Sequence, residues 1–492
     1  MKLMMSWIPL ALFGVVSIPV SAQFAPDLAQ LIPDADAVSN LERLEWQATG
    51  QHFEPGQTVV AGVGSLHNAS YMLQGTWEPS GEASYDWVLS TYYPYPSEFR
   101  YSETFASSGV GSVDGVDGFR PRRTGEMGPA RVAARSKFLW MSVPALLLTE
   151  ASDIAPISGQ PKSFRFVALD TSWVVNLDAE SGLPLQLSTT ADDPIFGPVQ
   201  SSVHYSAWQD VGSVMVPAQL EYRLDGDIIR REQRNELTAV MGGARDRPSY
   251  TVARSEPMFV RGWDQAHLHI RNIALAVAHM DTDPSLTVEL SEVGDGVYQV
   301  LGSSHHNLVI EVEDGLVVVD APLSPSRQEA VLEALEERWP EKPVRHLILS
   351  HHHYDHGAGL VTYAVAGVPI TMHSLNRELF FDAFVRQGLD PEINGVGAEA
   401  HLEIGGRAIG LYEIPTVHAE GMLGVYIADE RMLFINDIYS AGQEVRHPLW
   451  GSEALSAVRF LDVPVERVVG AHGRGTNTLA EMEAVVQRGL RR

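Results

Sequence analysis

A short histidine-rich segment constrains this chain more than any other feature. His351, His353, Asp355 and His356 lie within six consecutive residues, directly after a largely apolar run over 344–349. That run has the length and composition of a buried strand, so the four side chains sit on a loop at a strand end. Imidazole nitrogens and carboxylate oxygens are ligands that suit Zn²⁺. The segment therefore predicts a metal site.

The alternative is a histidine-rich surface loop, or histidines that only satisfy hydrogen bonds at a strand end. The density of ligand-type residues beside a buried strand favours the metal site. Alternation along an extended backbone directs His351, His353 and Asp355 the same way, whereas the adjacent His356 points differently. Two metal ions therefore fit this loop better than one.

Composition limits the partners and the chemistry. The chain has 492 residues, a formal net charge of −27 and a pI near 5.0. This length suggests about two or three domains. Nucleic acid and anionic lipid are not expected as partners, because both would repel so acidic a surface. The chain has no cysteine, so any zinc site must use histidine and carboxylate.

The first 22 residues have the pattern of a cleaved export signal. Lys2 precedes an apolar stretch over 3–18, and Val20, Ser21 and Ala22 place small residues before a cleavage site ahead of Gln23. A retained membrane anchor is the alternative, but no basic stop-transfer cluster follows. We expect a periplasmic or secreted protein with no stable membrane insertion after signal removal.

Residues 23–240 predict a mainly antiparallel β domain. A lead-in or short helix is expected over 23–50, and period-two patterning dominates 52–237, with strands over 84–90, 164–169, 172–177 and 218–224. Residues 145–148 fit a helix or a buried strand. The hairpin rhythm around 173–184, 205–208 and 215–217 resembles the curved sheets of periplasmic lipoprotein carriers. The resemblance implies a platform for an apolar ligand; the alternative is a structural sheet that packs on the second domain.

The patterning fades over 241–285, which we interpret as a linker; His267, His269 and His279 lie in it. From 286 to the end, strands and helices alternate. A helix is expected over 326–339 with Ser326 as its N-cap. Three later strands each end with a ligand-type residue, namely His418, Asp437 and His472, and an earlier strand ends with Asp320. Ligands gather beyond the carboxyl ends of strands in open sheets, so this placement is typical of a site.

In this order the motifs resemble the metallo-β-lactamase superfamily over about 287–492. The resemblance implies an α/β fold, the αββα four-layer metallo-β-lactamase sandwich, preceded here by the β domain. It also implies two Zn²⁺ ions per chain. His351, His353 and His418 would hold the first, Asp355, His356 and His472 the second, and Asp437 would bridge them. Asp320 would fix the histidine loop through hydrogen bonds.

Two features depart from the family pattern. The residues around His418 differ from those usual in the family, and a carboxylate at Asp437 argues against the zinc β-lactamases themselves. We expect a structural or solvated role for the seven histidines outside the motif, with two of them, His306 and His447, as candidates for the pocket mouth; the seven are His305, His306, His346, His352, His373, His401 and His447.

The expected chemistry is hydrolysis by a metal-bridging hydroxide. Asp355 would orient the water and carry a proton. Tyr439 is a candidate oxyanion contact, although a packed aromatic is the simpler interpretation, and Arg386, in a possible substrate loop over 382–400, is a candidate anion contact. We therefore expect an exported dinuclear zinc hydrolase acting on an ester, lactone or related acyl bond of a small molecule. The alternative is a ligand-binding or carrier protein with a catalytically weak metal domain.

Overall fold

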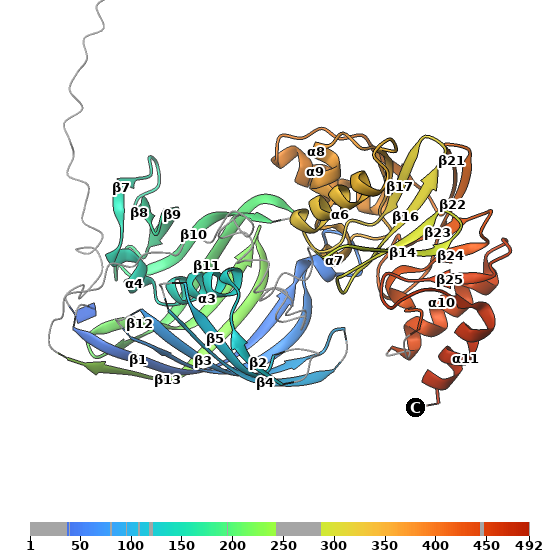
Figure 1. Cartoon of the computed structure of the whole chain (residues 1–492). Helices are drawn as coiled ribbons and strands as arrows, with labels where there is room; N and C mark the ends of the chain where they lie inside the picture. The colour runs from blue at the N-terminus through green and yellow to red at the C-terminus, as the bar shows by residue number, and fades with distance from the viewer. Residues whose placement is uncertain are drawn as a thin grey trace, which may run out of the picture.

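The computed structural model contains one large antiparallel sheet followed by a part built on two smaller sheets. Figure 1 shows the large sheet on one side and the two smaller sheets with their helices on the other. The structure describes residues 37–38, 40–78, 81–94, 96–106, 109–117, 122–193, 195–242, 287–442 and 447–491. The predicted signal over 1–22, and the histidines of the predicted linker, lie outside the described residues.

The N-terminal sheet has thirteen strands in the order β6-β5-β4-β3-β2-β1-β13-β12-β11-β10-β9-β8-β7. Its first and last strands therefore pair in the middle of the sheet. The strands are β1 (Leu41–Glu54), β2 (Leu66–Trp77), β3 (Glu82–Thr91), β4 (Ser97–Ala106), β5 (Gly111–Val116), β6 (Arg123–Glu126), β7 (Ser152–Pro156), β8 (Ser163–Ala168), β9 (Thr171–Leu177), β10 (Pro184–Asp193), β11 (Gly197–Val211), β12 (Val214–Leu224) and β13 (Asp227–Met241).

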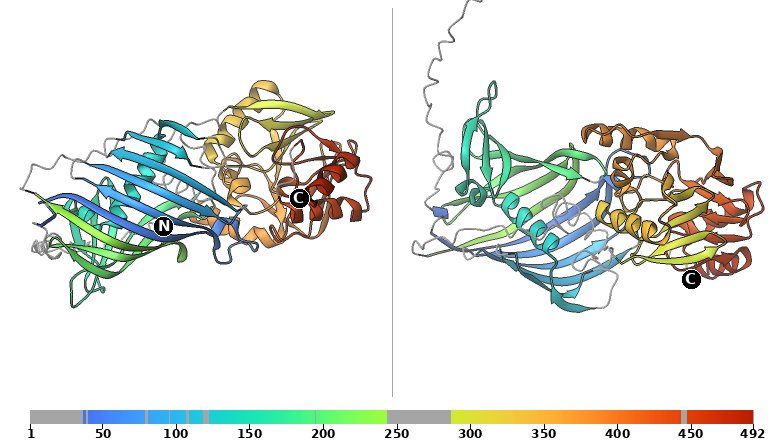
Figure 2. Two further views of the ribbon diagram at one scale, coloured as in Figure 1. Left: turned by 90° about the horizontal axis from the view of Figure 1, so that it is seen from below. Right: turned by 45° about the horizontal axis from the view of Figure 1, so that its top comes forward.

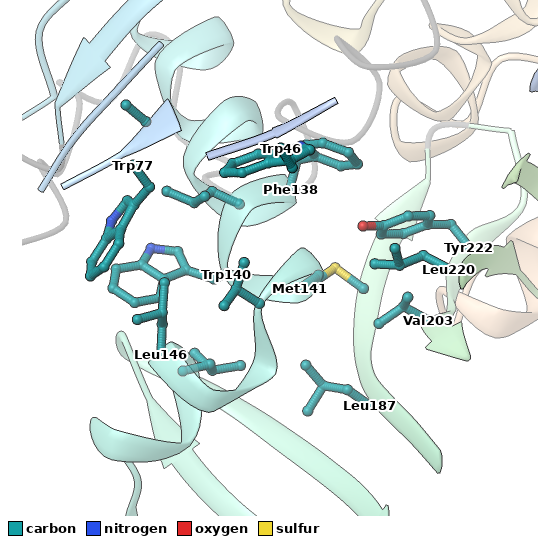
Figure 3. Packing of buried hydrophobic residues seen from close by; sticks show 14 of the residues in the cluster. Trp46, Trp77, Phe138, Trp140, Met141, Leu146, Leu187, Val203, Leu220 and Tyr222 are labelled. Carbon is teal, nitrogen blue, oxygen red and sulfur yellow. The ribbon is translucent and has the colours of Figure 1, made fainter. Parts of the chain in front are cut away.

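The period-two patterning arises because one face of this sheet is covered. Helices α3 (Pro129–Ser142) and α4 (Pro144–Thr149) lie in the curve of the sheet, as Figure 2 shows from two further directions. Figure 3 shows Trp140 of α3 beside Trp77 of β2, and the ring of Phe138 of α3 packs on that of Tyr222 of β12 with centroids 5.3 Å apart. Burial of such large side chains contributes most of the stability of this domain.

The structure decides two of the sequence-based expectations for this domain. The expected lead-in over 23–50 is wrong for its last ten residues, because 41–50 belong to β1, where buried and exposed side chains alternate. The stretch 145–148 is helical and fully buried within α4. Its four apolar residues fit a buried strand equally well, but Pro144 at the first turn favours the helix.

A buried charge network ties α3 to the sheet. Arg131 and Arg135 of α3 both donate from Nε to the carboxylate of Glu103 on β4, each at 2.6 Å. The indole of Trp87 donates to the same carboxylate at 2.8 Å. All three charged side chains are at most 1% exposed. Burial alone would raise the pKa of Glu103, but the two guanidinium groups hold that pKa below its usual value.

The C-terminal part contains a seven-stranded and a six-stranded sheet. The first has the order β14-β15-β16-β17-β18-β19-β20 and the second β21-β22-β23-β24-β25-β26. The strands are β14 (Glu289–Gly294), β15 (Val297–Leu301), β16 (Asn307–Val312), β17 (Gly315–Val319), β18 (Val344–Ile348), β19 (Ile370–His373), β20 (Ile393–Val396), β21 (Glu399–Ile404), β22 (Arg407–Glu413), β23 (Leu423–Ile427), β24 (Met432–Phe434), β25 (Arg467–Val469) and β26 (Asn477–Thr478).

Three apolar clusters fill this part. One lies between the seven-stranded sheet and its helices, one joins residues of the two sheets, and one lies between the six-stranded sheet and the last two helices. The helices of this part are α6 (Pro325–Arg338), α7 (Tyr354–Gly357), α8 (Leu360–Val365), α9 (Ser374–Arg386), α10 (Pro448–Phe460) and α11 (Leu479–Gly489), with the 3₁₀ helix η4 (Asn436–Ile438). A second 3₁₀ helix, η1 (Pro55–Gln57), follows β1 in the N-terminal part.

Helix α6 begins earlier than expected. Its N-cap is Ser324, whose side chain accepts from the backbone N–H of Arg327, and Pro325 occupies the first turn. Ser326, the expected N-cap, is therefore inside the helix. Proline at the first helical position is favourable, because its missing N–H would have no intrahelical partner there.

One end of the large sheet contacts the C-terminal part. The turn after β10 places Ile195 in the apolar cluster that contains Phe380 and Phe384 of α9. At the turn before β13, Asp225 accepts from Arg386 at 2.6 Å. The connection after β1 also reaches the C-terminal part, where the backbone N–H of Glu420 donates to the carbonyl of Val59 at 2.7 Å. In Figure 1 this blue segment lies beside α7.

Among the described residues, none of the helices is both long enough and apolar enough to cross a membrane.

Candidate metal centre

The candidate ligands lie close together because they follow the ends of neighbouring strands. His351, His353, Asp355 and His356 follow β18, Asp437 lies in η4 after β24, and His472 follows β25. Strand pairs β17–β18 and β24–β25 are parallel. Because parallel strands present their carboxyl ends at the same edge of a sheet, side chains that follow them meet there.

The first group of ligand atoms comprises His351, His353, His418 and Asp437. These atoms lie within 4.8 Å of one another. His418 Nε2 is 3.2 Å from His351 Nε2 and 3.3 Å from Asp437 Oδ2. The set is the one that the resemblance assigns to the first metal, together with the bridging carboxylate.

The second group surrounds the other oxygen of Asp437. Its Oδ1 is 2.8 Å from His356 Nε2 and 3.0 Å from His472 Nε2. Asp355 lies with His356 and Asp437, within the same 4.8 Å limit. One carboxylate therefore faces both groups, an arrangement that two neighbouring cations require of a bridging ligand.

Asp320 holds the histidine loop from behind. Its Oδ1 accepts from the backbone N–H of Ser350 at 2.8 Å, and its Oδ2 lies 3.2 Å from His356 Nδ1. Asn436 Nδ2 donates to the same Oδ2 at 2.5 Å. Asp320 is fully buried, with a φ of 63°. A backbone in this left-handed region is strained for aspartate, and it is held where the surroundings over-determine it.

The electrostatics differ between the two groups. Burial holds the pKa values of His351 and His353 well below the usual histidine value, and the neighbouring imidazoles add to the effect. Burial also acts to lower the pKa of His356 and His472, but the carboxylate of Asp437, helped by Asp320 at His356 and by the Ser304 carbonyl at His472, outweighs burial and raises both pKa values. In the metal-free protein His351 and His353 are therefore neutral, whereas His356 and His472 carry protons that a metal would displace.

Asp355 remains ionised although it is largely buried. Burial would raise its pKa, but a hydrogen bond from His305 and the nearby imidazoles hold that pKa below its usual range. His305 Nε2 is 3.1 Å from Asp355 Oδ2. The side-chain amide of Gln57 donates to Asp355 Oδ1 at 2.6 Å. Both oxygens of this carboxylate are thus held.

His305 belongs to the cluster, although sequence reasoning gave it a structural or solvated role. Its ligand atom lies within 4.8 Å of those of His356 and His472. The hairpin of β16 and β17, in which Leu308 pairs with Val319, could have placed His305 near the site. The start of β16 must therefore lie beside the end of β17, which carries Asp320.

Sequence analysis also missed three groups of the N-terminal domain that contact the histidine cluster. Besides Gln57, the carbonyl oxygen of Thr58 lies 2.7 Å from His352 Nε2 and 3.1 Å from His353 Nε2. The hydroxyl of Tyr93 lies 3.4 Å from His418 Nδ1. Nothing in the local sequence signals these contacts, because each joins residues about 300 positions apart.

The two substrate-contact candidates have other partners. Tyr439 is buried, and its hydroxyl donates to Asn477 Oδ1 at 2.8 Å. The packed-aromatic interpretation therefore fits, and the oxyanion role does not. Arg386 pairs with Asp225 and donates to the carbonyl of Phe196 on the N-terminal sheet. Its position indicates a contact between the two parts rather than an anion contact.

The expected substrate loop over 382–400 is mostly regular structure. Its first residues end α9, and residues 393–396 form β20, which pairs in parallel with β19. Of the two candidates for the pocket mouth, His447 stacks on Trp450 with ring centroids 4.3 Å apart, and Trp450 in turn contacts the ring of His418. His306 is buried, and its backbone N–H donates to Ala471 at 2.8 Å.

The donor set fits a metal. His353 Nδ1 is buried and has no hydrogen-bond partner among the described residues. A buried polar atom without a partner is costly. The neighbouring ligand atoms lie against one another, as His356 Nε2 and Asp437 Oδ1 do at 2.8 Å. All of them are ligand types for Zn²⁺, and a cation placed among them would satisfy them.

Comparison with known proteins gives one family. Residues 302–472 match the model of the metallo-beta-lactamase superfamily. Among solved structures, a metallo-beta-lactamase from Pontibacter korlensis is 17% identical with a TM-score of 0.34, covering 41% of this chain and 99% of that one.

Two curated relatives are similar over shorter segments. The 2,4-dinitroanisole O-demethylase subunit alpha of Nocardioides sp. (strain JS1661) is 26% identical over 213 residues, which are 42% of this chain and 63% of the relative. The linear primary-alkylsulfatase of Pseudomonas sp is 36% identical over 72 residues, 14% of this chain and 11% of the relative. The chain thus spans less than two thirds of the length of either relative.

Proposed function

The C-terminal domain belongs to the metallo-beta-lactamase superfamily, and on that premise we propose that the chain is an exported dinuclear zinc hydrolase that cleaves an ester, lactone or related acyl bond. One observation carries the proposal. Asp437 presents Oδ2 to a group with His351, His353 and His418, and Oδ1 to His356 and His472. Such a complete donor set has no structural purpose in a scaffold without metal.

Zn²⁺ bound at these groups would lower the pKa of water to near 7 and polarise a carbonyl oxygen. His351, His353 and His418 would hold the first ion, and Asp355, His356 and His472 the second, with Asp437 shared. Asp355 is ionised, and Gln57 and His305 hold its two oxygens. It is therefore oriented to accept a proton from water and to pass that proton to the leaving group.

Apolar side chains beside the cluster favour an apolar substrate. Val59 and Val60 follow Thr58, which contacts the histidine loop, and both are at least partly exposed. Val417 precedes His418, and Leu449 precedes Trp450, whose ring centroid is 4.6 Å from that of His418. The names of the two curated relatives refer to an aryl methyl ether and to alkyl sulfates. A small molecule with an alkyl or aryl group on the reacting oxygen fits both observations.

Two finer features complete the proposal. The apolar clusters support the four-layer αββα sandwich, because one lies between the sheets and the others lie between a sheet and its helices. The pattern of the first 22 residues supports export to the periplasm or beyond. The acidic charge of −27 favours a small-molecule substrate over nucleic acid.

The test combines metal content with turnover. The purified chain is expected to carry about two zinc ions and to hydrolyse some members of a panel of activated esters, lactones, thioesters, sulfate esters and phosphodiesters. A chelator should abolish that turnover, and added zinc should restore it. His353→Ala is expected to lose a metal and all activity. His401→Ala is the matched control, because the side chain of His401 is 68% exposed and its partner Glu399 is exposed too. A wild-type chain that binds zinc but turns over none of the panel would contradict the proposal.

The alternative is a ligand-binding or carrier protein in which the metal domain has little activity. A hollow of about 940 Å³ in the N-terminal sheet favours it, and both apolar residues such as Met72 and Val88 and polar residues such as Gln51 line that hollow. This alternative predicts binding of an apolar fluorescent probe that is unaffected by His353→Ala. The hydrolase proposal predicts turnover that His353→Ala removes.

A further inference from the structure

The five histidines around Asp437 each use only one ring nitrogen toward it. A metal-ligating imidazole is fixed in its tautomer and orientation by a partner on the other nitrogen. Three of these partners come from the C-terminal domain itself. His472 Nδ1 lies 2.7 Å from the carbonyl of Ser304, His356 Nδ1 faces Asp320, and His351 Nδ1 lies 3.1 Å from Ser350 Oγ.

The other two partners come from the N-terminal sheet. His353 Nε2 is 3.1 Å from the carbonyl oxygen of Thr58. A carbonyl oxygen only accepts hydrogen bonds, so this nitrogen must carry the proton. The lone pair of His353 is therefore on Nδ1, the buried atom without a partner among the described residues. The backbone of one domain thus selects the ligating nitrogen of the other.

Tyr93 acts on His418 in the same way. Its hydroxyl faces His418 Nδ1, and the two rings are stacked with an interplanar angle of 17°. When His418 Nδ1–H donates to this hydroxyl, the lone pair is left on Nε2, which points to His351 and Asp437. His353 and His418 are both members of the first group, so the sheet supports two of the three imidazoles there.

The connection after β1 is itself well anchored. Glu54 is fully buried, and its carboxylate accepts from the backbone N–H of Gly56 at 2.7 Å. Pro55, Gly56 and Gln57 are buried, and the carbonyl of Val59 accepts from the backbone N–H of Glu420. The segment 54–60 is therefore held at both ends, and it can fix the positions of the groups that it contacts.

We propose that the N-terminal sheet is a working part of the metal centre. The Thr58 carbonyl and the Tyr93 hydroxyl are positioning groups that keep the protons of His353 and His418 on the nitrogens that face away from the metal, and Gln57 orients Asp355 for the second ion. The proposal rests on the proposed function in that it assumes that the groups around Asp437 bind metal. It assigns the β-rich domain a role in metal affinity, independent of any ligand of its own.

The test is Tyr93→Phe in the full-length chain, which removes only the hydroxyl and keeps the stacked ring. Zinc affinity is measured by competition with a chromogenic chelator, and the visible absorption of the Co²⁺-substituted protein reports the geometry of each ion. We expect affinity for one of the two ions to fall about 10- to 100-fold and the Co²⁺ spectrum to change. The control is Tyr92→Phe. Tyr92 neighbours Tyr93 in sequence, but its hydroxyl donates to Ser70 at the surface, so both readouts should be unchanged.

Gln57→Leu is a second, independent variant, because it removes the amide donor to Asp355 at similar volume. It is expected to weaken binding of the second ion, which Asp355 would hold, and to leave the affinity for the first ion unchanged. Unchanged affinity and spectrum in both Tyr93→Phe and Gln57→Leu would overturn the inference. Failure of the proposed function has a different result, namely a wild-type chain that takes up two ions but shows no turnover. A wild-type chain that binds no metal would overturn both.

Discussion

Replacing Asp320 by asparagine tests how the histidine loop is held. The carboxylate oxygens face four donors, which are the backbone N–H and the hydroxyl of Ser350, the Nδ1 of His356 and the amide of Asn436. An asparagine keeps one acceptor oxygen, which can still bond the backbone N–H of Ser350, and presents an NH₂ group to the remaining three donors. The Ser350 hydroxyl can rotate and accept, but His356 Nδ1 and the Asn436 amide both lose their hydrogen bond to the carboxylate, and Asn436 keeps its contact with Ser350 Oγ.

The expected loss follows from those two donors. A hydrogen bond to a charged group contributes roughly 1.5–3 kcal/mol, so two of them correspond to about 3–6 kcal/mol. His356 also loses the partner that keeps its proton on Nδ1 and leaves its Nε2 available to a metal ion. Affinity for one metal ion should therefore fall about 10- to 100-fold. Asp320→Asn is expected to unfold at lower urea concentration when metal-free, and to retain about one zinc ion.

Urea unfolding followed by tryptophan fluorescence, together with zinc analysis of the folded protein, checks both expectations. Asp314→Asn is the matched control, because Asp314 and its partner Arg345 are both about half exposed and such pairs contribute little. If Asp320→Asn unfolds at the same urea concentration as the wild type and keeps both metals, the argument that Asp320 holds the loop is refuted.

Two further predictions concern charge. As pH falls from about 7.5 to 6, one zinc ion should be lost before the other, because the raised pKa values of His356 and His472 let protons compete with zinc for those two ligands. The zinc affinity should fall by up to about tenfold per pH unit for each proton displaced. Titration calorimetry in buffers of different ionisation enthalpy should detect proton release on zinc binding, and equal loss of both ions would contradict the prediction. Glu103→Gln should destabilise the N-terminal sheet by about 3–5 kcal/mol, because the buried guanidinium of Arg135 loses the carboxylate that it contacts, whereas Arg131 keeps its ion pair with Asp117. An unchanged unfolding midpoint would show that the ion pair between Arg135 and Glu103 contributes nothing to stability.

The grouping of the candidate ligands in one place was predictable, because the signal for each of them is local. His351, His353, Asp355 and His356 share a single loop, and His418, Asp437 and His472 each follow an apolar strand. Hydrophobic periodicity locates such strands, and parallel pairing then requires their ends to meet. The same periodicity located β3, β8, β9 and β12 of the large sheet, because one face of that sheet is covered and the other is open.

The contacts between domains were not predictable, for a physical reason. Thr58 acts through a backbone carbonyl, which every residue possesses, so its side chain carries no signal. Tyr93 and Gln57 are common residue types in ordinary connections between strands. Their role depends on how one end of the sheet docks on the second domain, and that docking depends on shape complementarity around residues such as Ile195.

The pairing of β1 with β13 has a consequence for biosynthesis. Leu41 and Met241 are neighbours across this pair, although 200 positions separate them in the sequence. As the polypeptide emerges from the ribosome, β1 can join β2 at once, but its opposite edge must wait until the strand ending at Met241 has been made. Contacts of such long range form slowly, and an unpaired edge is prone to pair with another chain. We therefore expect nascent chains that stop short of β13 to aggregate and to need a chaperone, whereas chains that include it do not.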